Sequence, residues 1–175
     1  MSPNQAYTFR RVTAEDFPLI YRWFKEPHIA VWWPIPERNE FFENFLKRIR
    51  SDNTFAYLCL LNDLPIAYIQ YYYVERTHGK NGAWFPPELP ITTVGTDQFI
   101  GIPDYIGKGH GTLLVKAFID YLVHQLEPTI TTVVVDPDPE NGAAIRCYEK
   151  VGFKRMGIYA APWGNALLMR YDIKP

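Results

Sequence analysis

Three glycines alternate with other residues just before a predicted helix, and this arrangement could bind a phosphate group. Gly107, Gly109 and Gly111 follow an apolar strand expected at Gly95–Ile102, and an amphipathic helical pattern continues over Thr112–Gln125. A helix N-terminus offers unpaired N–H groups and a partial positive charge, and glycine lets the backbone approach a ligand closely. The indicated chemistry is binding of phosphate or pyrophosphate by backbone amides. A glycine-rich helix start with only a packing role is the alternative.

Two well-known glycine motifs do not fit this spacing. The dinucleotide fingerprint requires G-x-G-x-x-G, whereas this run reads G-x-G-x-G. The P-loop of nucleotide hydrolases requires G-x-x-x-x-G-K-[ST], whereas Lys108 lies inside the run instead of after it. The pattern therefore matches neither of these two nucleotide sites.

A second stretch, from Asp136 to Phe153, favours a functional role for the glycine run. It follows an apolar strand expected at Thr129–Val135. Asn141 is suited to cap the N-terminus of a helix over Ala143–Val151, and Gly152 lies where the helix is expected to stop.

The two stretches together resemble the GNAT superfamily of acetyl-CoA-dependent N-acyltransferases. The matching motifs are Tyr105–Gly111 and Asn141-x-x-Ala144-x-x-x-Tyr148-x-x-x-Gly152-Phe153. The resemblance implies acetyl-CoA as co-substrate and no metal, with the glycine amides on the pyrophosphate and Asn141 near the pantetheine arm. The residues it assigns to acetyl-CoA are Ile100, Ile102, Tyr105, Gly107, Lys108, Gly109, His110, Gly111, Thr112, Asn141 and Ala144. One departure is Asp104, where the family usually has glutamine or arginine; backbone N–H groups still supply most of the phosphate binding.

Further segments resemble one branch of the superfamily, the aminoglycoside 6'-N-acetyltransferases. These segments are His28–Trp33, Asn62–Tyr68, Gly95–Gln98 and Ala144–Lys150. Two departures concern acidic residues of the branch: this chain has Asn81 in the long loop, and it has Trp163 or a neighbour between the last two strands.

Asp97 is the candidate catalytic carboxylate. Acetyl transfer to an amine requires a neutral amine, a donor for the oxyanion and a proton for the leaving thiolate. Asp97 lies in an apolar strand shortly before the glycine run, and the branch resemblance places its catalytic aspartate there. The alternative is a structural aspartate bonded to backbone N–H groups, because a buried carboxylate is costly without a partner.

Tyr148 is the candidate acid for the thiolate, because a neutral phenol can donate a proton at pH 7. The superfamily resemblance places this tyrosine near the sulfur. A core tyrosine on the inner face of the helix is the alternative.

The expected acceptor site is aromatic and acidic. The residues predicted to bind the acceptor are Trp32, Trp33, Trp84, Asp97 and Asp136. Trp32 and Trp33 could instead be packing anchors. The acidic run that starts at Asp136 could be a solvated loop or could attract a polycation, and the branch resemblance favours Asp136 itself.

The predicted function is acetyl-CoA-dependent N-acetylation of a small cationic amine, most specifically the 6'-amine of aminoglycosides. The alternatives are acylation of a hydroxylysine in siderophore assembly, acetylation of a polyamine or protein amine, and a non-catalytic CoA-binding sensor. The siderophore branch typically has histidine at the position of Asp97, which counts against it.

Length and composition predict one domain, over residues 1–175, with a sizeable core. The net charge of −1 gives no indication of a nucleic-acid surface. Two cysteines are too few for a disulfide framework, so Cys59 and Cys147 are expected to be buried, reduced thiols. The protein is expected to be cytoplasmic and to be a monomer or a homodimer. No apolar run is long enough to span a membrane, and the N-terminus lacks a signal pattern.

The pattern of elements predicts a mixed α/β, GNAT-like fold, with a six- to seven-stranded sheet and about four helices. Before the central strands, we expect a strand at Tyr7–Val12, a helix from Thr13 to Pro27 and a helix at Glu37–Ser51. A hairpin of Phe55–Leu61 with Pro65–Val74 and a long loop at Glu75–Val94 should follow. We expect the chain to close with a strand pair of Phe153–Ala160 with Ala166–Ile173.

Overall fold

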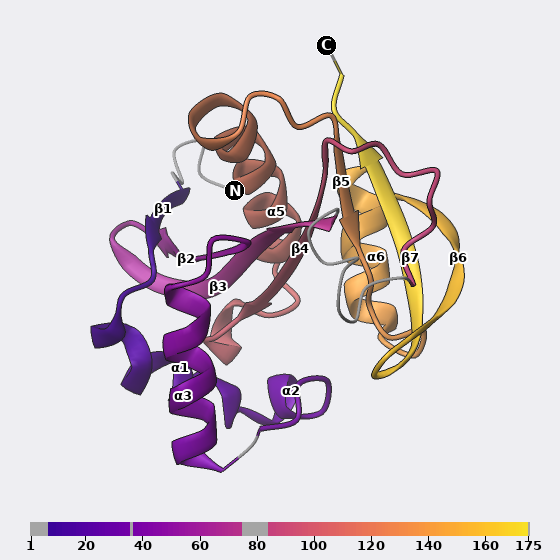
Figure 1. Cartoon of the computed structure of the whole chain (residues 1–175). Helices are drawn as coiled ribbons and strands as arrows, with labels where there is room; N and C mark the ends of the chain where they lie inside the picture. The colour runs from indigo at the N-terminus through magenta and orange to yellow at the C-terminus, as the bar shows by residue number, and fades with distance from the viewer. Residues whose placement is uncertain (1–6, 36, 75–83, 175) are drawn as a thin grey trace. The chain divides into compact units, whose positions relative to one another are not determined.

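The computed structural model describes residues 7–35, 37–74 and 84–174. Seven strands form a sheet with the order β1-β2-β3-β4-β5-β7-β6 (Figure 1). The strands are β1 (Tyr7–Arg11), β2 (Thr54–Leu61), β3 (Leu64–Tyr73), β4 (Thr93–Ile100), β5 (Thr132–Val135), β6 (Lys154–Ala161) and β7 (Gly164–Asp172). The predicted mixed α/β class is confirmed.

Five α-helices lie within the described residues, against about four predicted. They are α1 (Phe17–Phe24), α2 (Pro27–Ala30), α3 (Arg38–Ile49), α5 (His110–Tyr121) and α6 (Gly142–Val151). Pro27 was expected only to end the first helix, but it also begins the single turn of α2, because proline is tolerated at the first helical position. In the described ranges no helix has the length and apolarity that a membrane crossing requires.

The chain divides into two compact units. One comprises Met1–Gln70 and Gln98–Leu114, and the other comprises Tyr71–Asp97 and Val115–Pro175. Strands β3 and β4 and helix α5 each contribute residues to both units. The single domain expected from composition stays a prediction.

The first unit contains the predicted hairpin. Asn62 and Asp63 connect β2 to β3 with φ angles of 50° and 64°, the left-handed conformation of a two-residue hairpin turn. Helices α1 and α3 lie side by side (Figure 1) and interlock through aromatic rings, with Phe17 and Phe45 in edge contact at 5.5 Å between centroids. Phe42, on the same helix, also packs edge-on against Phe17, at 4.7 Å between centroids, and is 37% exposed.

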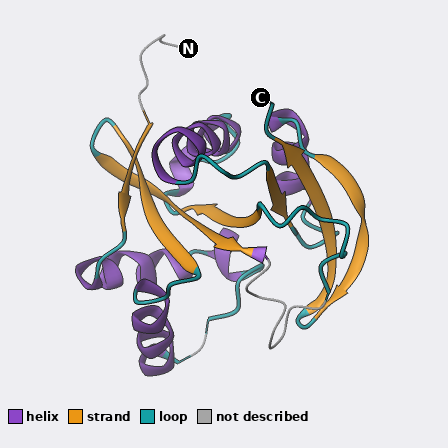
Figure 2. Ribbon diagram, turned by 45° about the horizontal axis from the view of Figure 1, so that its top comes forward, coloured by secondary structure: helices purple, strands orange, loops and turns teal. Residues whose placement is uncertain are grey.

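The second unit is built on strands β4 to β7. Strand β4 pairs parallel with β5, β5 pairs antiparallel with β7, and β6 and β7 form the closing hairpin (Figure 2). The loop before β4 was predicted at Glu75–Val94; residues 75–83, including Asn81, lie outside the described residues, and Thr93 and Val94 already belong to β4. The central strand therefore begins two residues earlier than predicted and ends two residues earlier, because Pro103 starts a short 3-10 helix.

Candidate functional site

The glycine run forms an open helix start in the first unit. Gly107 and Gly109 have φ angles of 73° and 86°, which side chains rarely adopt, and a Cβ atom at either position would meet nothing within 4 Å. Helix α5 begins at His110, and Leu113 N donates to Gly109 O at 3.2 Å. The N–H groups before Leu113 are the ones that a helix start leaves for another acceptor. The predicted anion-binding geometry therefore has the backbone that it needs.

His110 is held at this helix start by two tyrosines. Its Nδ1 lies 2.7 Å from the Tyr7 hydroxyl, and its ring packs edge-on against Tyr105 at 4.9 Å between centroids. Burial and the positive charge of Lys108 hold the pKa of His110 below its usual value. The cationic side chain of the glycine run is therefore Lys108, whereas His110 is neutral at pH 7.

The end of β4 is fixed by contacts within the first unit. Ile100 O accepts a hydrogen bond of 2.8 Å when His28 Nε2 carries the proton, and Ile102 O accepts from Tyr105 N at 3.1 Å. A Cβ atom on Gly101 would lie 2.1 Å from the Trp23 ring, so only glycine fits there. The contacts of Ile100 and Ile102 with the pantetheine arm stay a prediction.

Two carboxyl groups meet in the second unit just past the last paired residues of two parallel strands. The ladder between β4 and β5 pairs Gly95 with Val134 as its last residues. Asp97 and Asp136 each come two positions later, and strand alternation places them on the same face. Their charges interact, which raises the pKa of Asp136. The structure thus brings together two residues that are separated by thirty-nine positions in the chain.

Burial has the largest effect on this acidic pair. It raises the pKa of Asp136 to about 8, with the charge of Asp97 as the second cause. At pH 7 the pair therefore keeps a proton on Asp136, and it can lose this proton when a positive ligand arrives. We call Asp97 and Asp136 the acidic pair.

Tyr72 lies beside the acidic pair, and the sequence did not identify it as a site residue. Its pKa is raised well above the usual value by burial and then by the charges of Asp97, Asp136 and Tyr148. A Cβ atom on Gly95 would lie 2.2 Å from the Tyr72 ring, so the glycine leaves room for the ring. The available signal was alternation along the three consecutive tyrosines, which set Tyr72 apart from Tyr71 and Tyr73.

The other two tyrosines confirm that alternation. The rings of Tyr71 and Tyr73 lie 6.1 Å apart, and both hydroxyls donate to Glu127 Oε1, that of Tyr71 at 3.2 Å. Tyr72 instead faces Phe85, at 6.5 Å between ring centroids.

Tyr148 lies on the inner face of α6 and is 8% exposed. The predicted N-cap of this helix is confirmed, because Asn141 Oδ1 accepts from Ala144 N at 3.1 Å. Gly152 ends the helix with a φ of 121°. The ring of Tyr148 packs against Phe153 at 5.7 Å. Tyr148 interacts electrostatically with Tyr72, as Asp97 and Asp136 also do.

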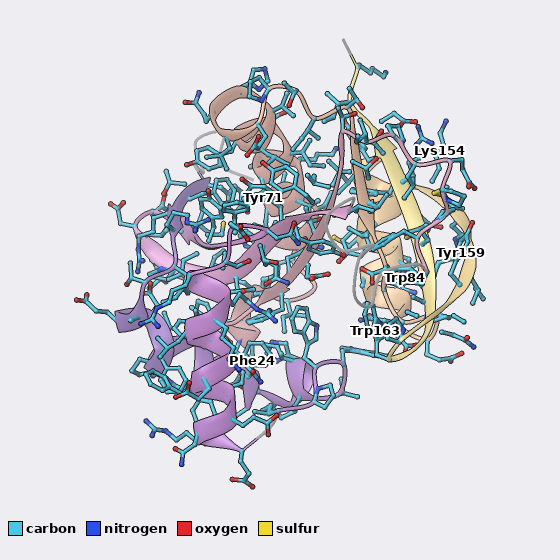
Figure 3. The ribbon with its side chains drawn as sticks, in the orientation of Figure 1. Phe24, Tyr71, Trp84, Lys154, Tyr159 and Trp163 are labelled. Carbon is cyan, nitrogen blue, oxygen red and sulfur yellow. The ribbon has the colours of Figure 1, made fainter. Side chains whose placement is uncertain are left out.

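Aromatic residues border this group in the second unit. Trp84 stacks on the buried Phe85 with 3.9 Å between ring centroids. Trp163, in the turn between β6 and β7, meets Trp84 edge-to-face at 5.5 Å and is 67% exposed (Figure 3).

The remaining predicted acceptor residues, Trp32 and Trp33, belong to the first unit and differ from each other. Trp33 packs edge-on against Phe24 and Phe99, each at 5.6 Å, so it is a packing anchor of that aromatic core. Trp32 is 38% exposed. A role of either residue in acceptor binding stays a prediction.

Possible metal ligands and the two cysteines were the remaining reactive side chains in the described part of the chain. It contains no group of three or more His, Cys, Asp or Glu side chains arranged for a metal ion. Cys59 is buried and free, as predicted. Cys147 also forms no disulfide, but it is only partly buried, because it lies between the inner and outer faces of α6.

Comparison with known proteins agrees with this geometry. The model of the acetyltransferase (GNAT) domain family matches residues 12–160. The chain therefore belongs to the GNAT acetyltransferase family, as its motifs predicted, and its fold is that of the family.

Its relatives include aminoglycoside-modifying enzymes. Aminoglycoside N(6')-acetyltransferase type 1 of Klebsiella pneumoniae is 34% identical over 171 residues, which cover 95% of this chain and 83% of that protein. A kanamycin resistance protein of Rhizobium radiobacter is 40% identical over 90 residues, covering 51% of this chain and 82% of that protein. The crystal structure of the aminoglycoside acetyltransferase AAC(6')-Ib in complex with coenzyme A and kanamycin matches with a TM-score of 0.84 and 34% identity, over 95% of each chain.

Proposed function

We propose that this protein transfers the acetyl group of acetyl-CoA to the 6'-amino group of aminoglycosides. The observation that carries the proposal is the acidic pair, Asp97 and Asp136, which lies just past the last paired residues of β4 and β5 and interacts with the same Tyr72 as Tyr148 does. Carboxylates attract and orient a polycation, and a neighbouring phenol can serve as an acid. The relatives named above support an aminoglycoside as the acceptor.

The reaction needs two proton movements, and the residues of this group are suited to both. The amine nitrogen attacks the thioester carbonyl, so a C–N bond forms and the C–S bond breaks. Asp97 accepts the proton that leaves the ammonium, directly or through water, and Tyr148 donates a proton to the thiolate. The oxyanion that forms between these steps requires a hydrogen-bond donor, which we assign to a backbone N–H of β4.

The glycine run is proposed to bind the pyrophosphate of acetyl-CoA. Gly107 and Gly109 present their backbone without side chains, and Lys108 adds a positive charge. Asn141, which already caps α6, leaves its amide nitrogen available for the pantetheine arm.

A turnover assay with an acceptor panel tests the proposal directly. Free thiol released from acetyl-CoA would be measured with kanamycin, a polyamine, hydroxylysine and no acceptor. We expect kcat/KM to be highest for the aminoglycoside. A preference for the polyamine or hydroxylysine would assign another acceptor, whereas CoA binding without turnover would make the protein a sensor. In the same assay, KM for kanamycin should rise with salt because screening weakens attraction between charges.

A valine at Gly109 should disrupt acetyl-CoA binding. The φ of 86° at this position is strained for any side chain, and valine would also occupy the open space in front of the amides. We expect the Kd for CoA, measured by calorimetry, to rise at least about tenfold, which corresponds to about 1.4 kcal/mol.

Gly164→Val is the matched control for Gly109→Val. Gly164 also has a positive φ, of 134°, with open space at its Cβ, but it is the first residue of β7, directly after the β6–β7 turn. This variant should lose stability without losing CoA affinity. An unchanged Kd in folded Gly109→Val protein would contradict the role of the glycine run.

The raised pKa of Asp136 predicts how stability depends on pH. The folded protein binds this proton up to about pH 8, whereas the unfolded chain releases it near pH 4. The contribution of this group to stability therefore falls as pH rises from about 4 to about 8. Asp136→Asn removes this loss, so its melting temperature should exceed that of the wild type by a margin that grows from about pH 4 to about pH 8 and is constant above that. A margin that is constant over the whole pH range would show that Asp136 titrates normally.

A further inference from the structure

Trp163 has a position and an exposure that the packing of the fold does not explain. Its side chain is 67% exposed in the turn between β6 and β7. Trp84 meets it edge-to-face at 5.5 Å, and Trp84 is itself held by stacking on the buried Phe85. Two rings that meet edge-to-face do not cover both faces of either ring, so at least one face of the Trp163 indole is not covered by Trp84. Trp163 is therefore held against Trp84 and still has an indole face exposed to solvent.

A series of ring contacts connects this face to the acidic pair within the second unit. Trp84 contacts Phe85, and Phe85 faces Tyr72 at 6.5 Å. Tyr72 in turn interacts with both aspartates of the acidic pair. The exposed indole is thus continuous with the proposed acceptor site and is not an isolated surface tryptophan.

Strand geometry gives the separation. Leu167 N donates to the carbonyl of Pro137, the residue after Asp136, at 2.9 Å. Gly164 lies three residues before Leu167, so the turn is about 10 Å farther along β7 at roughly 3.3 Å per residue. If the reacting amine of an acceptor lies at the acidic pair, the part of the acceptor that contacts Trp163 must be a different ring, about 10 Å away.

The chemistry at this remote end differs from that at the acidic pair. The segment from Tyr159 to Met169 contains no charged side chain. This segment itself offers a positive group an indole face and no carboxylate. Aromatic faces bind ammonium groups through their quadrupole, and tryptophan does so most strongly.

We propose that Trp163, held by Trp84, binds a remote ammonium-bearing ring of the acceptor by a cation–π contact and so selects multi-ring aminoglycosides. This inference rests on the proposed function, because it assumes a polycationic acceptor whose reacting amine lies at the acidic pair. Trp163 acts here on specificity and takes no part in proton transfer.

Steady-state kinetics of three variants test this role. Trp163→Ala should raise KM for kanamycin by about 3- to 30-fold, the range expected for the loss of one cation–π contact, at nearly constant kcat. Trp163→Tyr keeps an aromatic face, so its KM for kanamycin should stay close to that of the wild type. Ile158→Ala is the matched control, because Ile158 is a 62% exposed apolar residue of β6, and it should leave KM unchanged. With a single-ring 6-amino sugar, Trp163→Ala and wild type should have the same kcat/KM.

Two outcomes separate this inference from the proposed function. Wild-type turnover of kanamycin with an unchanged KM in Trp163→Ala, or an equal loss for the single-ring sugar, would overturn the role of Trp163 alone. If the wild type does not turn over kanamycin, kanamycin binding is measured by calorimetry in wild type and Trp163→Ala. Weaker binding by Trp163→Ala would support a binding role of Trp163 without catalysis. Equal binding, or no binding, by both proteins would overturn both proposals.

Discussion

Asp97→Asn is expected to lower kcat/KM for aminoglycosides by about 10²- to 10⁴-fold, the usual size of general-base effects. The amide keeps the shape of the carboxylate but can neither accept the proton of the ammonium nor attract its charge. CoA affinity should be nearly unchanged, because the glycine run is a separate part of the chain. Turnover by thiol release and CoA binding by calorimetry would measure the two effects.

The same substitution should also change Asp136. Asp97 is the second cause of the raised pKa of Asp136, so removing its charge should lower that pKa from about 8. The direction distinguishes an interacting pair from two independent carboxyl groups. Titration of Asp136 followed by carboxyl NMR in the Asp97→Asn variant would measure this shift.

Asp120→Asn is the control for the loss of one negative charge, because Asp120 is exposed on α5. It should change kcat/KM less than twofold. A structural Asp97 predicts a different result: a lower melting temperature, with activity loss that follows the unfolded fraction. Full activity of Asp97→Asn, together with a KM that does not respond to salt, would rule out both the catalytic role and the polycationic acceptor.

Tyr148→Phe is expected to lower kcat by about 10²- to 10⁴-fold with little change in the Kd for CoA. The side chain is only 8% exposed and packs on Phe153 through its ring, so phenylalanine preserves the packing and removes the proton donor. Because the proposed step is protonation of the leaving thiolate, the loss should appear in kcat and not in acceptor affinity. Single-turnover kinetics with saturating acetyl-CoA and kanamycin would measure it.

Tyr171→Phe provides the matched hydroxyl deletion. Tyr171 lies on β7 and packs against the same Phe153, at 5.4 Å between ring centroids. This variant should keep kcat within about twofold and should bind CoA like the wild type. Equal rates for Tyr148→Phe and wild type would make Tyr148 a core residue with no part in the chemistry.

The sequence alone determined the features that depend on neighbours in the chain. Asn141 caps α6 through a bond to a residue three positions later, so the capping side chain and the helix start are local. Asn62 and Asp63 tolerate positive φ, which defines the hairpin between β2 and β3. The glycine run is likewise local, because only the residue type permits φ angles of 73° and 86°. The family resemblance rests mainly on such local motifs.

The tertiary structure decided which residues share a site. Tyr72, Asp97 and Asp136 come from β3, β4 and the end of β5, so strand register and a missing side chain at Gly95 bring them together. Alternation gave the face of Tyr72 but not its neighbours on that face. Burial then raised the pKa of Asp136, a property that no local pattern contains.

Adjacent tryptophans show the same limit. Composition could not tell which of Trp32 and Trp33 packs inward, and contacts with Phe24 and Phe99 made Trp33 the anchor. The exposed face of Trp163 likewise depends on Trp84, which precedes it by seventy-nine positions in the chain. The sequence by itself determined the glycine run, the helix cap and the hairpin turn, because backbone conformation there follows from residue type. Only the tertiary structure decided the acidic pair and the aromatic face, because burial and contact between distant residues exist only once the strands have paired.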